Sequence, residues 1–571
     1  MSDNVDIFDS VEQRADYLDD SELIAQTAAN DAFNTIYAEL LKKQTILVVG
    51  PRGCGKTHIM RYTALTCKSD VTKPLAIYVS FNRYYRLEPL LGMNVNALEI
   101  FHSWVLARIL LATFEASKDA VDLCLPEQLK DLSNIPKLTH LINKIERGIS
   151  LFEEEAEFSS KITIYSVINI IDVVRDYYNR SRTILLLDDA ALTLTPEYMK
   201  EFFDIFRVIK TSKLSLKASV YPGTTEYGAR FHPTQEGRFE NIWMSVESPT
   251  YLTDLESIAL KRIVDYEKIP TEIANYLKYA AFGVPRAFLF MAQEYIHRKN
   301  DSNKQHVINK ITQEHLASRV EEFISIGLKA PKFKSLIETG VSSFNKMVGL
   351  IKEANEKYIK INQKQLRVGI EDDFDAPLAK RMLNLLVEAG LLYEIPAKVS
   401  HGDDRNYIRY IPHTCALFEE KVFTPSERGW SVSTVLERIS FPSVKQPVRR
   451  KINTLLSKDE IASLKLDLPP CASCGTERIN PSQKFCHNCG NELIDSSSYE
   501  ECLRLPLHSI PGLTEWTRKK IREELPKIKC IGDFLSTQDP SAELRQVSRF
   551  GPVKASKIIK LVNTYVDEFL Q

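Results

Sequence analysis

Eight consecutive residues have the types and spacing of a phosphate-binding loop. The run Gly50-Pro51-Arg52-Gly53-Cys54-Gly55-Lys56-Thr57 fits the pattern G-x-x-x-x-G-K-[ST]. Its glycines let backbone amides face phosphate oxygens, while Lys56 is placed for the β and γ phosphates and Thr57 for Mg²⁺. An apolar run precedes the loop and a predicted helix from His58 to Leu65 follows it, which is the context that the motif needs. Residues 50–58 are therefore predicted to bind a nucleoside triphosphate; a chance glycine-rich turn is the alternative.

Two adjacent aspartates are predicted to complete this site. Asp188 and Asp189 end the apolar run Ile184–Leu187, which is typical of a buried strand. A carboxylate at such a strand end can hold Mg²⁺ through water, and its neighbour can orient the attacking water. We assign Asp188 to Mg²⁺ and Asp189 to the water. A helix cap before a turn at Ala190 is the alternative.

Two cysteine pairs with trailing glycines predict a small zinc ribbon. The sequence has C-x-x-C-G twice, with eleven residues between the pairs, and the four cysteines are Cys471, Cys474, Cys486 and Cys489. Four thiolates suit tetrahedral Zn²⁺, and four protein ligands leave no open position for catalysis. The prediction is a structural Zn²⁺ site, which two matched pairs favour over a redox role.

The phosphate-binding loop and the acidic pair, in this order, resemble the AAA+ ATPases and in particular their origin-recognition-complex-like branch, over about residues 30–330. The resemblance implies a sensor-1 strand ending in the run Ala218–Gly228, where Thr224 is the first choice and Thr225 the second. It also implies a sensor-2 motif in Gly283-Val284-Pro285-Arg286, with Arg286 as the phosphate-sensing cation. A helix start with proline in the first turn is the alternative for that motif.

The same resemblance implies an arginine finger supplied by a neighbouring subunit, for which Arg230 and Arg238 are both candidates; each is alternatively a surface arginine. One feature departs from the family, which usually has Asp-Glu where this chain has Asp188-Asp189. The shorter carboxylate lies about one methylene farther from the water, so slow hydrolysis is expected. Asp-Asp is also common in the signal-transduction ATPases with numerous domains, which act as switches.

The C-terminal residues resemble two helix-hairpin-helix motifs. The copies are Ser509–Ile521 and Val547–Ile558, and residues 502–571 carry twelve Lys and Arg against eight Asp and Glu, a net charge of +4. Each copy keeps one of the two usual glycines, because Thr514 and Arg549 replace the others. Such hairpins offer backbone amides to DNA phosphates without reading bases, although degenerate copies also serve as protein-packing modules. The predicted DNA contacts are Gly512, Arg518, Lys519, Gly551, Lys554 and Lys557.

A helix followed by two strands predicts a winged helix upstream of the zinc ribbon. Residues 378–389 form one apolar helical face closed by Gly390, and residues 391–399 and 406–412 read as strands joined by a loop. The basic residues expected near DNA phosphates are Lys380, Arg381, Lys398, Arg405 and Arg409. Packing against protein is an equal alternative, because Asp372, Asp373 and Asp375 lie just upstream.

These sites need elements that position them. Runs at 45–50, 74–81, 182–189 and 213–223 are typical of strands, and helical segments between them, including an insertion at about 96–180, predict a parallel sheet covered on both faces. The predicted fold is multidomain, with an α/β P-loop domain, a helical lid, a winged helix, a zinc ribbon and an all-α helix-hairpin-helix domain. The predicted boundaries are 1–245, 246–335, 336–423, a linker at 424–469, 470–494 and 500–571. The linker is basic through Lys445, Arg449, Arg450 and Lys451.

Composition limits the class of protein. A chain of 571 residues with 44% apolar and 26% charged residues can build three or four packed domains, which excludes a disordered or fibrous protein. The net charge of −1 excludes a surface that binds polyanions everywhere, but not local basic patches. Ten cysteines are too few for a disulfide scaffold, and a reducing cytoplasm fits best. We expect no membrane partner, since apolar runs such as Thr183–Leu187 are short and the N-terminus is acidic.

The sequence therefore predicts an AAA+ ATPase with ATP, Mg²⁺ and Zn²⁺ as cofactors. Double-stranded DNA, further copies of the same chain and an effector protein are the expected partners. By analogy with bacterial ATPases that carry variable tails, the expected setting is antiviral defence or a mobile element. Two alternatives stay open: a signalling scaffold switched by ATP and ADP, with negligible turnover, and a regulator of transposition that forms ATP-dependent filaments on DNA.

Overall fold

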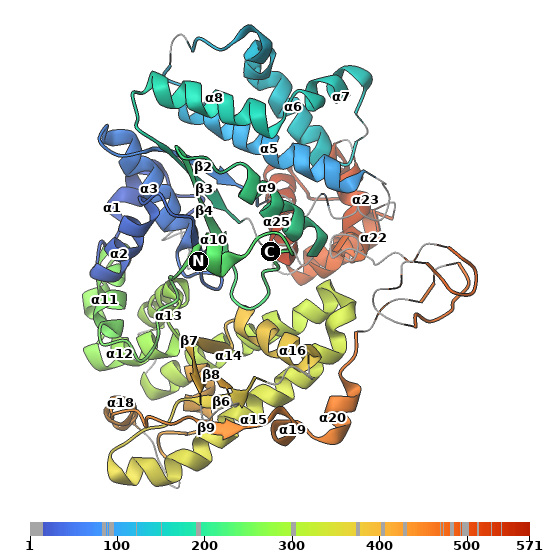
Figure 1. The fold of residues 1–571 in the computed structure, drawn as a ribbon. Helices are drawn as coiled ribbons and strands as arrows, with labels where there is room; N and C mark the ends of the chain where they lie inside the picture. The colour runs from blue at the N-terminus through green and yellow to red at the C-terminus, as the bar shows by residue number, and fades with distance from the viewer. Residues whose placement is uncertain are drawn as a thin grey trace.

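The structure is a computed structural model of the 571-residue chain (Figure 1). It describes residues 15–82, 87, 90, 96–120, 123–149, 151–189, 196–298, 304–372, 377–400, 406–425, 431–466, 468, 470–471, 473–479, 483, 485–491, 493, 502–510, 513–526, 528–537 and 539–570.

A parallel five-stranded sheet forms the centre of the N-terminal region. Its strands are β1 (Ile46–Val49), β2 (Leu75–Ser80), β3 (Thr183–Asp188), β4 (Leu214–Val220) and β5 (Arg238–Asn241), in the order β2-β3-β4-β1-β5. The four predicted strands are confirmed. The sequence did not indicate β5, because this edge strand is mostly exposed and lacks an apolar pattern.

Alternate residues of the strands supply two cores, one on each face of the sheet. Leu185 and Leu187 pack with α5 (Ala97–Ala116) and α9 (Pro196–Val208), whereas Ile184 and Leu186 pack with α2 (Asp31–Leu40) and α3 (Lys56–Ser69). Side chains that alternate along a strand point to opposite faces. The predicted parallel sheet covered on both faces is therefore present (Figure 1). The other elements here are α1 (Asp20–Ala25), η3 (Glu127–Ser133), α6 (Ile135–Glu146), α7 (Glu153–Ser160), α8 (Ile164–Tyr177) and α10 (Pro233–Glu236).

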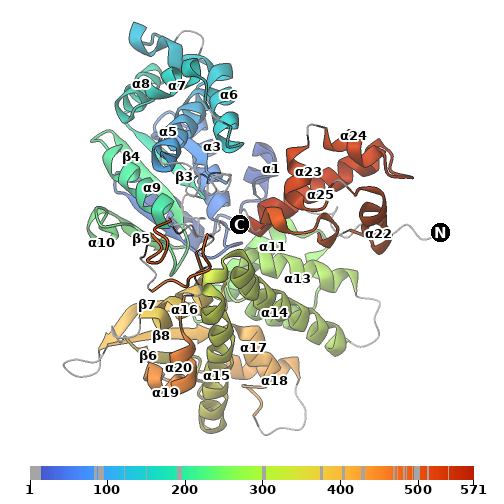
Figure 2. The same cartoon turned by 90° about the vertical axis from the view of Figure 1, so that its right-hand side faces the viewer.

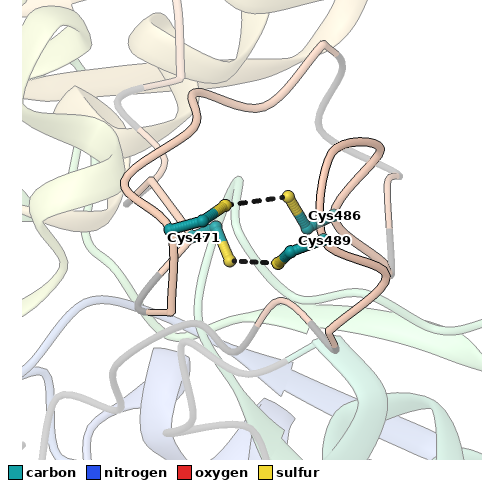
Figure 3. A group of neighbouring side chains, drawn as sticks. Cys471, Cys486 and Cys489 are labelled. Atoms are coloured by element: carbon teal, nitrogen blue, oxygen red, sulfur yellow. Dashed lines mark hydrogen bonds between the residues drawn. The ribbon is translucent and has the colours of Figure 1, made fainter.

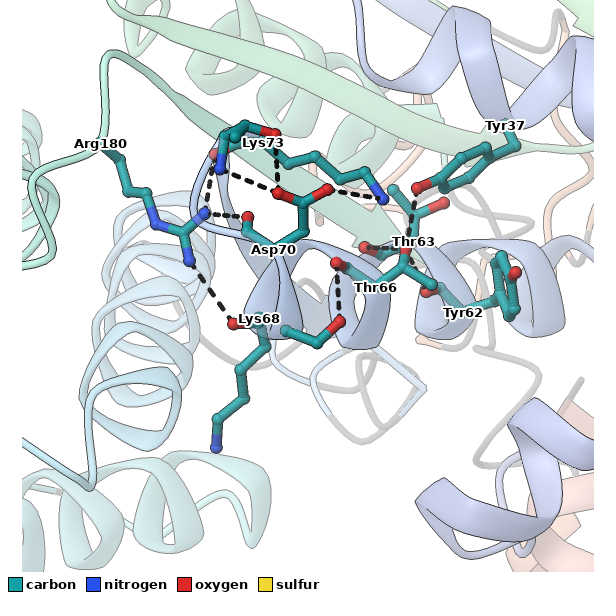
Figure 4. A network of polar contacts seen from close by, with 10 residues as sticks. Tyr37, Tyr62, Thr63, Thr66, Lys68, Asp70, Lys73 and Arg180 are labelled. Atoms are coloured by element: carbon teal, nitrogen blue, oxygen red, sulfur yellow. Dashed lines mark hydrogen bonds and ion pairs between the residues drawn. The ribbon is translucent and has the colours of Figure 1, made fainter.

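Polar contacts hold the C-terminal end of α3 against the sheet (Figure 4). Arg180, just before β3, donates from Nη1 to the Lys73 carbonyl at 2.9 Å and also bonds the Asp70 carbonyl. On the other side, the Tyr37 hydroxyl lies 3.0 Å from Thr66 Oγ1. The helix that follows the phosphate-binding loop is thus fixed at the end distant from the loop.

Helix α5 corrects one expectation. Among the residues that the structure describes, it is the one helix that is long and apolar enough to cross a membrane, with a mean hydropathy of 1.4 over its window. The expectation that the apolar runs are short, as at Thr183–Leu187, therefore missed this helix. Its Trp104, Val105 and Leu106 are buried, and it packs on β2, α6, α8 and α9. Packing on all sides accounts for its apolar composition.

The middle of the chain builds a second core below the sheet domain (Figures 1 and 2). The predicted lid contains α11 (Tyr251–Arg262), η4 (Tyr266–Lys268), α12 (Thr271–Ala280), α13 (Pro285–His297), α14 (Lys304–Lys329) and η5 (Pro331–Phe333). Next come α15 (Lys334–Tyr358), η6 (Ile359–Ile361), β6 (Val368–Glu371), α16 (Pro377–Glu388), β7 (Leu392–Ser400), β8 (Asn406–Pro412) and α17 (Thr414–Glu419). The helix and two strands expected at 378–412 are α16, β7 and β8.

The segment predicted as a linker takes part in this core. It contains α18 (Val432–Ile439), β9 (Val448–Arg450), α19 (Ile452–Leu455) and α20 (Lys458–Ser463). Strand β9 pairs in parallel with β6 and completes a four-stranded sheet in the order β7-β8-β6-β9. The C-terminal tail contains η7 (Leu507–Ser509), α22 (Glu515–Glu524), α23 (Ile531–Ser536), α24 (Pro540–Arg545) and α25 (Pro552–Leu570) (Figure 2).

Candidate nucleotide site, cysteine cluster and tail

The phosphate-binding loop has the backbone that its glycines predict. Gly53 and Gly55 have φ of 88° and 92°, a left-handed conformation that favours glycine, and α3 begins at Lys56 directly after the loop. A Cβ atom on Gly53 would lie 3.1 Å from Arg286 Cβ, so the loop also packs closely against the lid. The first amides of α3 have no partners within the helix and are available to an anion.

A cavity of about 290 Å³ lies beside this loop. The end of β3 contributes Asp189, the end of β4 contributes Tyr221, and the lid contributes Arg286. The loop side of the wall is made of Arg52, Gly53, Cys54, Gly55, Lys56, Thr57 and His58. Gly50 and Pro51 precede these and act through their carbonyls. The structure thus brings the predicted loop, the second aspartate and the lid arginine to one space.

Lys56 is held inside the loop. Its Nζ donates to the carbonyls of Gly50 at 2.5 Å and Pro51 at 3.1 Å, and lies 4.0 Å from the centroid of the Tyr221 ring. Burial lowers the pKa of Lys56, while the nearby Cys54 and Asp189 oppose that shift. The amine therefore has two weak carbonyl partners that phosphate oxygens can replace with stronger, charge-assisted bonds.

The two aspartates occupy different positions. Asp188 is fully buried; its Oδ2 accepts from the Tyr78 hydroxyl at 3.0 Å, and its Oδ1 has no hydrogen-bond partner within the described ranges. Asp189 lines the cavity with φ of 55°, and its amide donates to Ser219 Oγ at 2.8 Å. Burial, followed by the neighbouring Asp188, raises the pKa of Asp189 well above its ordinary value.

This arrangement fits a magnesium ion. Asp188 has an acceptor oxygen without a donor, and Thr57 supplies a hydroxyl at the cavity wall. Oxygen donors of this kind are what Mg²⁺ prefers. The predicted pair of Thr57 and Asp188 is therefore chemically suited to the ion, although Asp188 is fully buried and, unlike Asp189, does not line the cavity.

The sensor-1 candidates lie elsewhere. Thr224 is buried and Thr225 Oγ1 donates to the Tyr221 carbonyl at 2.9 Å, but neither threonine belongs to the cavity wall as the described residues define it. Two other residues contact the site instead. Ser219 Oγ accepts the hydrogen bond from the Asp189 amide, and Tyr221 is part of the cavity wall. Ser219 is the next-to-last residue of β4, and Tyr221 directly follows the strand. The alternation of Ser215, Lys217 and Ser219 with apolar residues was the signal for this face that the sequence contained.

The lid arginine lies where sensor-2 was predicted. Pro285 begins α13, and the amide of Arg286 donates to the Gly53 carbonyl at 3.4 Å. Both arginine-finger candidates are exposed and lie outside the described cavity wall: Arg230 is 3.4 Å from Asp204, and Arg238 is 2.8 Å from Glu240. Exposure is what a residue acting on a neighbouring subunit requires, so the choice between them stays open.

The comparisons with known proteins bear on this site. Residues 12–87, which include the phosphate-binding loop and strand β2, match the family model described as ORC-CDC6-like. This segment is similar to that family. The match supports the predicted origin-recognition-like AAA+ ATPase and covers the first part of the predicted resemblance. No curated protein matches the chain.

Three solved structures resemble the chain at low identity. The Walker-type ATPase PABY2304 of Pyrococcus abyssi has 12% identity and a TM-score of 0.36, covering 72% of this chain and 99% of that one. Aeropyrum pernix ORC1, solved in complex with DNA, has 14% identity and a TM-score of 0.29, covering 68% and 92%. Aeropyrum pernix ORC2, in ADPNP–ADP complexes, has 11% identity and a TM-score of 0.32, covering 73% and 93%. With TM-scores below 0.5, these likenesses add nothing to the ORC-CDC6-like match.

Farther along the chain than the ORC-CDC6-like segment, the four predicted zinc cysteines come together (Figure 3). Their sulfur atoms all lie within 4.8 Å of one another, with Cys471 3.4 Å from Cys489 and Cys474 3.5 Å from Cys486. Each pair forms the same turn: the amides of Gly475 and Gly490 donate to the carbonyls of Cys471 and Cys486. A cluster of four thiol groups on two matched turns is compatible with Zn²⁺.

In the tail, the predicted second hairpin lies between α24 and α25. Arg549, which stands where the resemblance expects a glycine, has φ of 66°, a left-handed conformation that favours glycine, and Gly551 has open space around its missing Cβ. In the first hairpin, Gly512 lies outside the described residues, and Thr514 caps α22 by accepting from the Thr517 amide.

The basic residues of the tail have distinct surroundings. Lys554 Nζ lies 4.0 Å from the Trp516 ring centroid and 4.6 Å from that of Phe550. Lys519 is largely exposed and 3.9 Å from Glu523, whereas Arg518 donates to the Ile510 carbonyl at 3.3 Å. Lys557 also takes part in an interaction with another residue. Lys519 is thus open to a phosphate, and Lys557 is exposed as well.

The predicted DNA-facing helix contacts the ATPase domain instead. Arg381 on α16 lies 3.6 Å from Glu226, in the loop after β4, and Lys380 lies 3.1 Å from Asp372. A Cβ on Gly223 would lie 2.7 Å from the Asn384 carbonyl, so loop and helix touch through their backbones. The arrangement favours the packing alternative for α16. Arg405, Asp373 and Asp375 lie outside the described residues, as does the side chain of Lys398.

Proposed function

We propose that the chain binds Mg²⁺-ATP in the 290 Å³ cavity and hydrolyses it. The observation that carries the proposal is that the amides of the loop, the carboxylate of Asp189 and the guanidinium of Arg286 share one wall. Thr57 and Asp188 would hold Mg²⁺, which supplies charge for the leaving phosphate oxygens. Lys56 exchanges its carbonyl partners for phosphate oxygens, Arg286 approaches from the lid, and Asp189 orients the attacking water.

Asp189→Asn is expected to keep ATP binding and to slow hydrolysis by about 100-fold, because an amide orients and deprotonates water poorly. The measurements are phosphate release and the Kd for ATP. Asp265→Asn is the matched control: it makes the same change at another residue with positive φ, on the lid surface away from the cavity. Wild-type turnover in Asp189→Asn would assign the water to another group.

A slow switch is the second candidate for the same site. The shorter Asp189 and its raised pKa both reduce its readiness to act on water. A switch predicts bound nucleotide, negligible turnover and no effect of DNA, whereas a DNA-dependent ATPase predicts turnover that rises with duplex DNA. ATP turnover measured with and without duplex DNA, with particle mass followed in parallel, separates the two.

The proposal extends to double-stranded DNA as the partner of the tail. Its support is the predicted second hairpin, with a left-handed φ at Arg549 and open space at Gly551, together with the net charge of +4 over residues 502–571. Such a tail contacts the phosphate backbone and not the bases.

Lys519→Gln combined with Lys554→Gln is expected to weaken duplex binding equally for unrelated sequences. The slope of log K against log salt should fall by about 0.9 for each phosphate that the variant no longer neutralises. The control is Lys130→Gln with Lys137→Gln, two exposed lysines of the helical insertion. If both pairs of variants bind DNA like the wild type, the DNA-binding surface lies outside the tail.

The remaining parts of the proposal concern the setting. We propose homo-oligomers in which Arg230 or Arg238 reaches the ATP of a neighbouring subunit, an effector partner, and a role in bacterial antiviral defence or in a mobile element, with control of transposition as the alternative. The proposed location is the cytoplasm, because four clustered cysteines must stay reduced to hold a metal.

A further inference from the structure

One face of α11 forms the wall of the cavity on the lid side. Thr250, just before the helix, and Asp254, Ile258 and Arg262 within it all line the cavity. Residues four apart lie on the same face of a helix, so these four form one stripe. Phe33 and Ile36 of α2 line the same cavity, and with Ile258 they make part of the wall apolar.

The acidic member of this stripe is buried yet only half bonded. Asp254 is 6% exposed, and its Oδ2 accepts from the Thr250 hydroxyl at 2.7 Å. Within the described part of the chain, Oδ1 has no hydrogen bond or ion pair, and it is not enclosed by protein. The backbone is firmly placed as well, because Asn30, which caps α2, donates to Ser257 Oγ at 3.2 Å on the same helix.

When a ligand fills the cavity it displaces water from Asp254 Oδ1, and this acceptor then costs free energy unless the ligand supplies a donor. The phosphates are directed to the loop by its amides, so the groups that meet α11 belong to the nucleoside. A nucleoside that places a hydrogen-bond donor against Asp254 Oδ1 gives this oxygen a partner. A nucleoside that places a carbonyl there leaves two acceptor oxygens facing each other. Sites built in this way discriminate strongly, since the wrong ligand leaves a buried polar group unpaired.

We propose that Asp254 selects the base of the nucleotide by accepting a hydrogen bond from the exocyclic amino group of adenine. The proposal rests on the nucleotide-binding function proposed above. The same acceptor chemistry would suit a ribose hydroxyl or the donor edge of guanine, so the test distinguishes these sources.

The test measures Kd by calorimetry for ATP, GTP, purine riboside triphosphate (which lacks the amino group), 2′-deoxy-ATP and 3′-deoxy-ATP. Asp254→Asn keeps the shape and an acceptor for Thr250 but turns the open atom into a donor. Wild type should bind ATP about 10- to 100-fold more tightly than purine riboside triphosphate, the range of one hydrogen bond to a charged group. Asp254→Asn should remove this preference and improve GTP binding. Asp265→Asn, with a thermal melt of each variant, controls for general effects of the substitution.

Several results would overturn the proposal. Equal weakening of all five nucleotides by Asp254→Asn would show a structural role. If Asp254→Asn abolishes only the preference for ATP over the two deoxy-ATP analogues, the hydrogen bond goes to the ribose. If the wild type prefers GTP to ATP, the hydrogen bond goes to guanine. If wild type binds all five equally, only the Asp254 proposal fails, whereas binding of none of them overturns the proposed function itself.

Discussion

Lys56→Ala is expected to weaken ATP binding by at least about 100-fold. The amine is buried and bonded to the carbonyls of Gly50 and Pro51. Two charge-assisted bonds to phosphate, at roughly 1.5–3 kcal/mol each, account for an effect of this size. Alanine removes the cation that balances the phosphates in a cavity that also contains Asp189, so repulsion from the carboxylate adds to the loss.

The binding measurement needs a control for folding, because alanine also leaves two loop carbonyls without the amine. Lys68→Ala lies on the same helix, is exposed, and pairs only with Asp119 among the ion pairs of the described residues. It should bind ATP like wild type. A folded Lys56→Ala protein with wild-type affinity would show that the loop does not hold the phosphates.

The parts of the site that the sequence predicted are those in which chemistry depends on local spacing. The loop follows β1, Asp188 ends β3 and Asp189 follows it, and parallel strands end at the same edge of a sheet, so their proximity followed from the fold class. The cysteine cluster followed in the same way, because each C-x-x-C-G closes its own turn.

The parts that were missed depend on contacts between distant segments. The stripe from Thr250 to Arg262 has a legible four-residue period, but its purpose appears only when α11 packs across the loop and α2. Ser219 and Tyr221 were overlooked although Ser215, Lys217 and Ser219 alternate with apolar residues, because this alternation does not say which polar residue ends at the cavity. The threonines chosen instead lie past the strand end, where the chain has already turned away.

Contacts between distant segments also decide the role of the basic residues upstream of the ribbon. Arg381 has the type and place of a DNA contact, but tertiary packing pairs it with Glu226, in the loop after β4. Tyr221, at the start of that loop, lines the cavity. Charge in a sequence therefore indicates a possible phosphate contact, whereas the partner is decided by what the folded chain places opposite it.

Cys474→Ser is expected to lose the metal and the folded ribbon together. Among the described residues of 471–490, the buried apolar ones are Cys471 and Cys486, so we expect the order of this segment to depend on an ion that four sulfur atoms within 4.8 Å can share. Structural zinc contributes apparent binding free energies of about 10–16 kcal/mol in small metal-dependent folds, and a serine hydroxyl does not replace a thiolate.

Cys124→Ser, an exposed cysteine outside the cluster, is the matched control and should keep one zinc per chain by elemental analysis. ATP binding should persist in both variants, because no residue of the ribbon lines the cavity as described. A wild type purified without metal, or a Cys474→Ser protein that retains a full equivalent of zinc, would contradict the assignment, because the geometry leaves three sulfur atoms as the most that the variant can offer.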